Sequence, residues 1–175
     1  MAGVGLLALA LWMLRFDIAG RTVRQRGLPR YIAVCLLVGY VWLAVGGLLA
    51  LAFGPVLAGP GYDALLHSLF LGCVMSMIFG HAPIIVPIVL RRAVAFRPTL
   101  YAPLAVLHLS LLLRVTADLL GSPAGQQWGG LLNVAAILFF AVHMAISARA
   151  PAAARASPGG QPSTWPAVAT PHRGH

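Results

Sequence analysis

The run YIAVCLLVGYVWLAVGGLLALAF, residues Tyr31–Phe53, decides the fold, because it carries no charged side chain from end to end. A helix needs roughly 20 predominantly apolar residues to cross about 30 Å of hydrocarbon. This run meets that length without interruption. It therefore predicts a helix that crosses a lipid bilayer, and the other apolar runs can be compared with it.

The composition of the whole chain agrees with a membrane protein. Of its 175 residues, 60% are hydrophobic and 9% are charged, and the mean hydropathy is +0.89. These values exclude a water-soluble domain of this length. Further apolar runs predict spans at 62–90, 100–120 and 129–146, and a short span at 2–14. We therefore predict an all-α, polytopic transmembrane helix bundle over residues 1–146, with four full spans plus the short N-terminal one.

Basic residues alternate between the predicted loops. Arginines crowd the connections 15–30 and 91–97 and follow the last span, whereas the loops 54–61 and 121–128 carry no charge. In membrane proteins the basic loops face the cytoplasm. The pattern predicts an N-terminus outside the cell and a C-terminus in the cytoplasm. It also explains the net charge of +9 without a nucleic-acid partner, because the arginines do not gather on one face.

The two ends of the chain differ from the spans. The tail 147–175 is rich in Pro, Ala, Gly and Ser, which predicts a disordered cytoplasmic segment. The run 2–14 lacks both the basic n-region and the cleavage site of a signal peptide, and it is short for a span. We expect it to be part of a helix of a longer ancestral or full-length protein. Cys35 and Cys73 are expected at depths about 10 Å apart, which excludes a disulfide.

Inside the predicted spans lie four histidines: His67, His81, His108 and His143. An ionisable side chain in hydrocarbon is costly, so each of them is a candidate functional residue. At about 1.5 Å per residue, His81 and His143 reach a similar depth near the cytoplasmic side. Two histidines from different helices at one level fit a bis-histidine haem or a metal site. Interhelical hydrogen bonding is the alternative, and it stays open.

One face of the span 62–90 carries a second candidate ligand set. His67 and His81 point within roughly 40° of each other on a regular helix, which we expect to be the face toward the bundle interior. Met77 and Cys73 precede His81 on the same flank at successive steps of four. Such a stripe fits a soft copper site, and ordinary packing of Met and Cys is the alternative. The candidate metal ligands are His67, His81, His143, Met77 and Cys73.

Arg114 and Asp118 are the charged residues of the span 100–120. Because they are four residues apart on one helix, they are predicted to form an ion pair in the outer half of the membrane. Two other roles remain open for Arg114. Its guanidinium can snorkel to the outer interface, or it can bind a haem propionate in bidentate fashion.

Three further residues give local signals in the span 62–90. Asp63 is expected to be the N-cap of its helix. Pro83 and Pro87 each lack the N–H that a helical residue donates, so we expect the helix to kink or stop at its cytoplasmic end.

Three segments together resemble the C-terminal part of the NnrS family of bacterial membrane proteins. They are GYVWLAVGGLLALAFG at 39–54, ALLHSLFLGCVMSMIFGHAP at 64–83 and LLLRVTADLL at 111–120. The most specific element is an early helix histidine, His67, followed by Met77, Ile78, Gly80 and His81. The resemblance implies haem and copper as cofactors, a role in the response to nitric oxide or in electron transfer, and a place in the bacterial inner membrane.

Soluble enzyme classes find no support in the sequence. It contains no Gly-rich phosphate loop, no CxxC pair and no HExxH motif. The alternative to a haem or copper protein is a cofactor-free membrane subunit or transporter fragment, whose histidines tie helices together or relay protons. The expected partners are the lipid bilayer and further membrane subunits or a second copy of the chain, with no nucleic acid.

Overall fold

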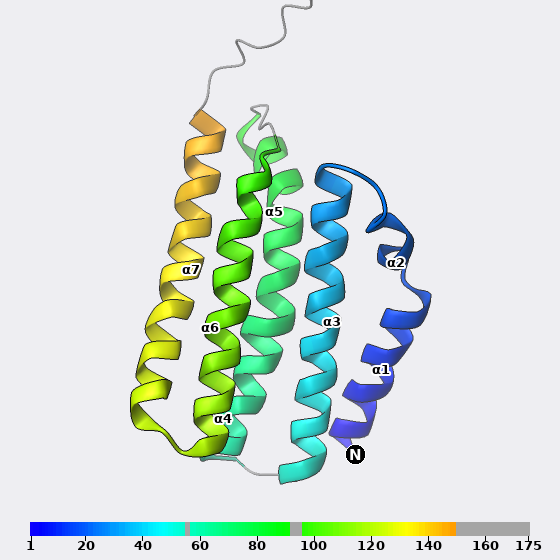
Figure 1. Cartoon of the computed structure of the whole chain (residues 1–175). Helices are drawn as coiled ribbons and strands as arrows, with labels where there is room; N and C mark the ends of the chain where they lie inside the picture. The colour runs from blue at the N-terminus through cyan, green and yellow to red at the C-terminus, as the bar shows by residue number, and fades with distance from the viewer. Residues whose placement is uncertain (55–56, 92–95, 150–175) are drawn as a thin grey trace, which may run out of the picture.

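The computed structural model describes residues 1–54, 57–91 and 96–149, and this part of the chain is helical with no strand (Figure 1). The helices are α1 (Ala2–Phe16), α2 (Ala19–Thr22), α3 (Leu28–Phe53), α4 (Pro60–His67), the π-helical segment η1 (Ser68–Val74), α5 (Met75–Leu90), the 3-10 turn η2 (Pro98–Leu100), α6 (Tyr101–Leu120) and α7 (Pro123–Arg149). Four of the resulting rods are long and apolar enough to cross a membrane: Leu28–Phe53, Pro60–Leu90, Pro98–Leu120 and Pro123–Ala148. The predicted fold class, with its short N-terminal apolar helix, is confirmed.

The rods run alternately up and down and pack side by side (Figure 1). Helix α7 lies against α6, and α3 packs on the rod formed by α4, η1 and α5. Helix α1 lies on the outer side of α3 and covers only part of its length. The core at the arginine-rich end includes Tyr31, Phe79 and Phe140, the last two stacked with ring centroids 3.8 Å apart.

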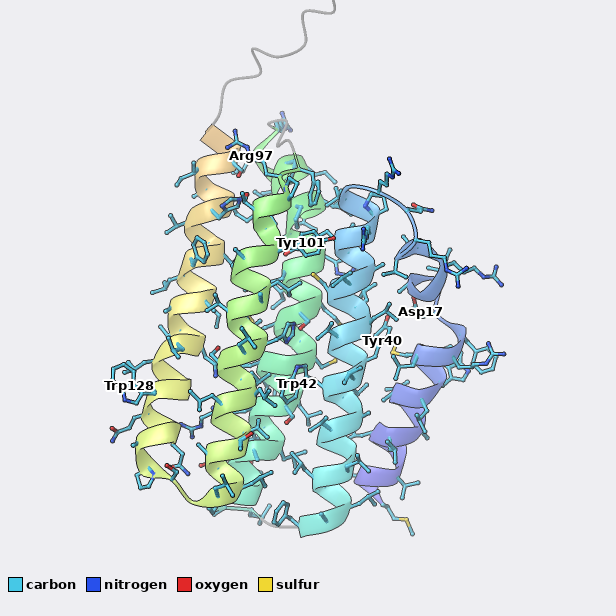
Figure 2. All side chains as sticks on the ribbon, viewed as in Figure 1. Asp17, Tyr40, Trp42, Arg97, Tyr101 and Trp128 are labelled. Atoms are coloured by element: carbon cyan, nitrogen blue, oxygen red, sulfur yellow. The ribbon has the colours of Figure 1, made fainter. Side chains whose placement is uncertain are left out.

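Alternate connections lie at opposite ends of the bundle. The end that contains the start of α3, the end of α5 and the start of α6 carries Arg30 and Arg91. Arg97 lies at the same end (Figure 2). The opposite end contains Gly54 and Gly121 and has no arginine in its short connections. This separation agrees with the alternation read from the sequence. Which end faces the cytoplasm stays a prediction.

The last helix is longer than predicted. Helix α7 begins at Pro123, so most of the predicted loop 121–128 is helical. Two local signals explain the early start: proline suits the first helical position because its missing N–H needs no partner there, and the Ser122 hydroxyl accepts a hydrogen bond from the Gly125 N–H at 3.4 Å. Residues 147–149 also belong to α7. The rest of the predicted tail, 150–175, lies outside the described residues.

Two expectations for the second rod are corrected. Helix α5 continues through Pro83 and Pro87 and ends at Leu90, so of the kink or stop expected there, the stop does not occur. In a membrane, neighbouring helices and small local adjustments satisfy the backbone groups that a proline frees. Asp63 is not the N-cap, because Gly59 takes that position with φ 96° and Pro60 follows at the first helical position. Asp63 lies in the first turn instead, where its negative charge interacts favourably with the positive end of the helix dipole.

Candidate functional site

A buried charge cluster lies near the end of the bundle with the uncharged loops. Asp118, in the last turn of α6, is fully buried. Arg114 lies one turn earlier, and its Nε is 3.2 Å from the Asp118 carboxylate. The predicted ion pair is therefore confirmed. We call Asp118, Arg114 and His67 the Asp118 site.

Helix α7 completes the surroundings of Arg114. The guanidinium donates a hydrogen bond to the Gln126 carbonyl oxygen at 2.8 Å. One turn further, Gly129 packs directly against α6, and a Cβ on this glycine would lie 2.7 Å from the Arg114 Cα. Backbone and carboxylate thus hold Arg114 inside the bundle, with only 17% of its side chain exposed. This geometry favours pairing within the chain over the snorkelling of Arg114 to the interface.

His67 brings a titratable ring to the Asp118 site from α4. Its Nδ1 lies 2.7 Å from the Asp63 carbonyl oxygen and 4.0 Å from Asp118 Oδ2. A carbonyl oxygen only accepts hydrogen bonds, so Nδ1 carries the hydrogen in the neutral ring and Nε2 keeps a lone pair. The side chain is 24% exposed, whereas Asp118 is sealed off. His67 is therefore the most exposed member of the site.

A polar seam continues from the Asp118 site along α6 and α7. The Ser110 hydroxyl lies 2.7 Å from Asn133 Oδ1 and 3.0 Å from the Leu107 carbonyl oxygen. Within the described part of the chain, Asn133 Nδ2 and Asp118 Oδ1 are buried without a hydrogen-bond partner. Asp118 Oδ1 still lies 3.2 Å from the Arg114 Nε, so its charge is compensated by the ion pair. The seam therefore places polar groups of α6 and α7 against each other inside the bundle.

His108 forms a separate network in the middle of the bundle. The Trp42 Nε1–H donates to His108 Nδ1 at 3.1 Å, so Nδ1 is the acceptor and Nε2 carries the hydrogen. Nε2 faces the Ser76 hydroxyl at 3.4 Å, and this hydroxyl donates to the Gly72 carbonyl oxygen. The network joins α3, α6 and the π-helical segment. A protonated ring would turn two donors toward each other at Trp42, so the network holds His108 neutral.

Replacing His108 with leucine is expected to lower the free energy of unfolding by about 1–2 kcal/mol, because Trp42 and Ser76 lose their shared partner inside the bundle. Unfolding in mixed micelles, titrated with a denaturing detergent, measures this difference. The neighbouring Leu109→Ala is the control, since Leu109 faces outward and is 68% exposed. Equal stabilities for the two variants would show that the network contributes nothing.

His81 does not lie on the inner face where it was expected. Its side chain is exposed, and its Nδ1 lies 2.7 Å from the Met77 carbonyl oxygen of its own helix. The π-helical segment between His67 and His81 is the physical reason, since it adds residues per turn and rotates everything after it relative to a regular helix. Met77 and buried Cys73 pack together toward α1 and α3. Both cysteines are free, as predicted.

His143 lies apart from the other histidines. Its Nε2 is 3.0 Å from the Thr99 hydroxyl, which belongs to the turn before α6. Its ring also meets Phe139 edge-on, with centroids 6.4 Å apart. His143 thus faces the turn before α6, whereas the His81 side chain is exposed on α5. The similar depth predicted for these two histidines does not bring them onto one face.

The candidate metal ligands do not gather. Over residues 1–54, 57–91 and 96–149, no three His, Cys, Asp or Glu side chains come close enough together to hold a metal ion. His108 uses both ring nitrogens in its network, and Arg114 is held by Asp118 and Gln126. His67 and His81 each bond through Nδ1 to a carbonyl oxygen of their own helix, so Nε2 is the atom through which either ring would hold a haem iron. For the expected copper ligands His67, His81, His143, Met77 and Cys73, no three of the His and Cys side chains gather within the described residues.

The fold and the Asp118 site define a multi-pass α-helical protein, with four helices long and apolar enough to cross a membrane and a buried ion pair near one end of the bundle. The family model described as a domain of unknown function (DUF8744) matches residues 1–149, so the chain belongs to this family. No curated protein and no solved structure matches the chain.

Proposed function

We propose that the protein is a membrane subunit or transporter module that relays protons through the Asp118 site. The observation that carries the proposal is a sealed carboxylate beside a histidine that reaches the surface. Asp118 is fully buried, and His67, 24% exposed, lies 4.0 Å from it. Ionisable groups inside a membrane bundle are costly and mark ion or proton pathways.

Each residue of the site has a distinct part in the relay. Arg114 holds the Asp118 carboxylate in place, with its Nε 3.2 Å away. His67 accepts a proton on Nε2, since Nδ1 already donates to the Asp63 carbonyl. It then releases the Nδ1 proton to Asp118, whose Oδ2 lies 4.0 Å from Nδ1, and the ring returns to its neutral form. The polar seam at Ser110 and Asn133 extends the path toward the middle of the membrane through water.

Membrane vesicles from cells that produce the protein test the relay. Under a potassium diffusion potential, we expect an internal pH indicator to report proton entry well above that of vesicles without the protein. His67→Gln and Asp118→Asn are expected to reduce this entry to the background. Arg91→Gln is the matched control, because Arg91 is an exposed residue that only caps α5. Proton entry that is equal in all vesicles would exclude the relay.

A haem protein is the second candidate, and the resemblance of the segment His67–His81 to the NnrS family favours it. His67 or His81 would bind haem iron through the lone pair on Nε2. Haem proteins that hold the iron through a single histidine are common. Copper binding and a role in the nitric oxide response or in electron transfer are proposed from the same resemblance alone.

The optical spectrum separates the two candidates. Detergent-purified protein from haem-replete cells should show a Soret band that His67→Ala or His81→Ala removes or shifts. His143→Ala is the control, because its ring nitrogen is held by Thr99. A colourless preparation would exclude the haem candidate and leave the proton relay.

The orientation in the membrane is proposed from the arginines. We place the end with Arg30, Arg91 and Arg97 in the cytoplasm and the Asp118 site on the outer side of a bacterial inner membrane. The N-terminus is then outside and the end of α7 inside. On this assignment the relay takes up protons from the outer aqueous phase.

A further inference from the structure

The connection between α1 and α3 begins near the middle of the membrane. The Tyr40 hydroxyl donates to Asp17 Oδ2 at 3.0 Å, which fixes the end of α1 against the middle of α3. Along α3, Tyr40 lies about 14 Å from Tyr31 and about 20 Å from Phe53. Since the hydrocarbon core is about 30 Å thick, Asp17 lies close to its midplane. Figure 2 shows Asp17 and Tyr40 facing each other midway along the bundle.

Contact with lipid is unfavourable for this part of the chain. Helix α1 ends at Phe16, and Asp17 is extended, with its Oδ1 accepting from the Ala19 N–H at 2.6 Å. Arg15 and Arg21 are exposed on either side of it. Interrupted backbone and arginine at this depth occur where protein or a water-filled cavity covers them. Two large apolar side chains, Phe16 at 67% and Ile18 at 74% exposure, lie between the arginines.

The positive charge of this surface is not neutralised within the described residues. Their ion pairs shorter than 4.0 Å all involve Asp118, and Asp118 is on another helix. Asp17 already accepts from Tyr40 and from the Ala19 N–H. Arg15 lies over the Phe16 ring at 5.3 Å. A depression of about 490 Å³ beside Arg15, Asp17 and Arg21 has room for a further polar group.

We infer that this surface binds a transmembrane helix from outside the chain that carries a carboxylate at mid-depth. The surface, here called the α1–α2 face, consists of Trp12, Arg15, Phe16, Ile18 and Arg21. An acidic side chain in the depression would pair with the two arginines, and the aromatic and aliphatic side chains would pack against the helix that carries it.

A second copy of the chain does not supply that carboxylate. The chain has three acidic residues. Asp118 is buried and paired, and Asp63 lies at the start of α4, at the end of the bundle with the uncharged loops. Asp17 remains, and a symmetric pair of α1–α2 faces would bring four arginines together with two carboxylates that are already hydrogen-bonded. The charge balance therefore favours a different, acidic partner helix.

Site-specific photocrosslinking in the native membrane tests the inference. A benzophenone amino acid replaces Ile18 in the full chain, and in the control it replaces Leu109, which is 68% exposed and about 12 Å along α6 from Tyr101. We expect a discrete protein adduct at 18 and only lipid adducts at 109. Mass spectrometry should place the adduct at 18 in a membrane-spanning helix with Asp or Glu near its centre. The double variant Arg15→Gln, Arg21→Gln should lower the adduct yield about tenfold.

Four outcomes would overturn the inference: lipid adducts alone at 18, an adduct to a second copy of the chain, an adduct to a helix without a central carboxylate, or a yield unaffected by the double variant. The thermal unfolding of the double variant is also measured, so that adduct yields are compared only between proteins that are folded to the same extent. None of these results depends on proton relay at the Asp118 site, because the two surfaces share no residue.

Discussion

Replacing Asp118 with leucine is expected to lower the free energy of unfolding by about 3–5 kcal/mol, because it leaves the Arg114 guanidinium buried without its carboxylate. Arg114 would keep only the Gln126 carbonyl as a partner, and Gly129 packs too closely to let its backbone move aside. Leucine is larger than aspartate, so the substitution opens no cavity and the loss comes from the uncompensated charge.

Detergent-induced unfolding measures this loss, and the double variant Arg114→Leu, Asp118→Leu separates its causes. Removing both charges is expected to restore most of the stability, since a buried ion pair replaced by apolar side chains is often neutral or better. Asp63→Asn is the control, because this residue lies in the first turn of α4, is only half-buried and belongs to no ion pair among the described residues. A double variant as unstable as Asp118→Leu would contradict the explanation.

Gly72→Ala is expected to lower the free energy of unfolding by about 2–3 kcal/mol, since even a methyl group there overpacks the core. A Cβ on Gly72 would overlap Trp42 Cβ and Cγ, which are the base of a buried side chain and cannot swing away. Pushing Trp42 aside also breaks its hydrogen bond to His108. The effect should therefore exceed that of His108→Leu.

Gly5→Ala is the matched control for Gly72→Ala. Nothing lies within 4 Å of a Cβ at this position in α1, and alanine favours the helix. The same unfolding titration compares the two. If Gly72→Ala were as stable as Gly5→Ala, the close packing of Trp42 on the π-helical segment would be wrong.

The fold could be predicted from the sequence because a helix needs a minimum number of apolar residues to cross the hydrocarbon core of a membrane. The run Tyr31–Phe53 and the spacing of the arginines were enough to predict the number of spans and the alternation of their ends. The start of α7 was missed, although Ser122 and Pro123 are ordinary helix-start signals, because their surroundings look like a loop by hydropathy alone. The continuation of α5 through Pro83 depends on contacts with neighbouring helices, and a local sequence pattern does not reveal these contacts.

The candidate site could be predicted from the sequence only in part. The Arg114 and Asp118 pair follows from their spacing on one helix. The direction of His81 does not, because the π-helical segment rotates the helix by an amount that the sequence does not reveal. The partners of His108 were missed as well: Trp42 and Ser76 come from two other helices, and their order around the bundle is set by tertiary packing.

The proton relay depends on a coupling between His67 and Asp118, and the ¹⁵N spectrum of the histidine ring nitrogens in bilayers observes it most directly. We predict that His67 carries its hydrogen on Nδ1 and keeps the lone pair on Nε2 in the neutral ring, because Nδ1 donates to the Asp63 carbonyl oxygen. In Asp118→Asn the Nδ1 signal should shift, because the carboxylate 4.0 Å from this atom is gone. A His67 signal that is the same in both proteins would contradict the relay.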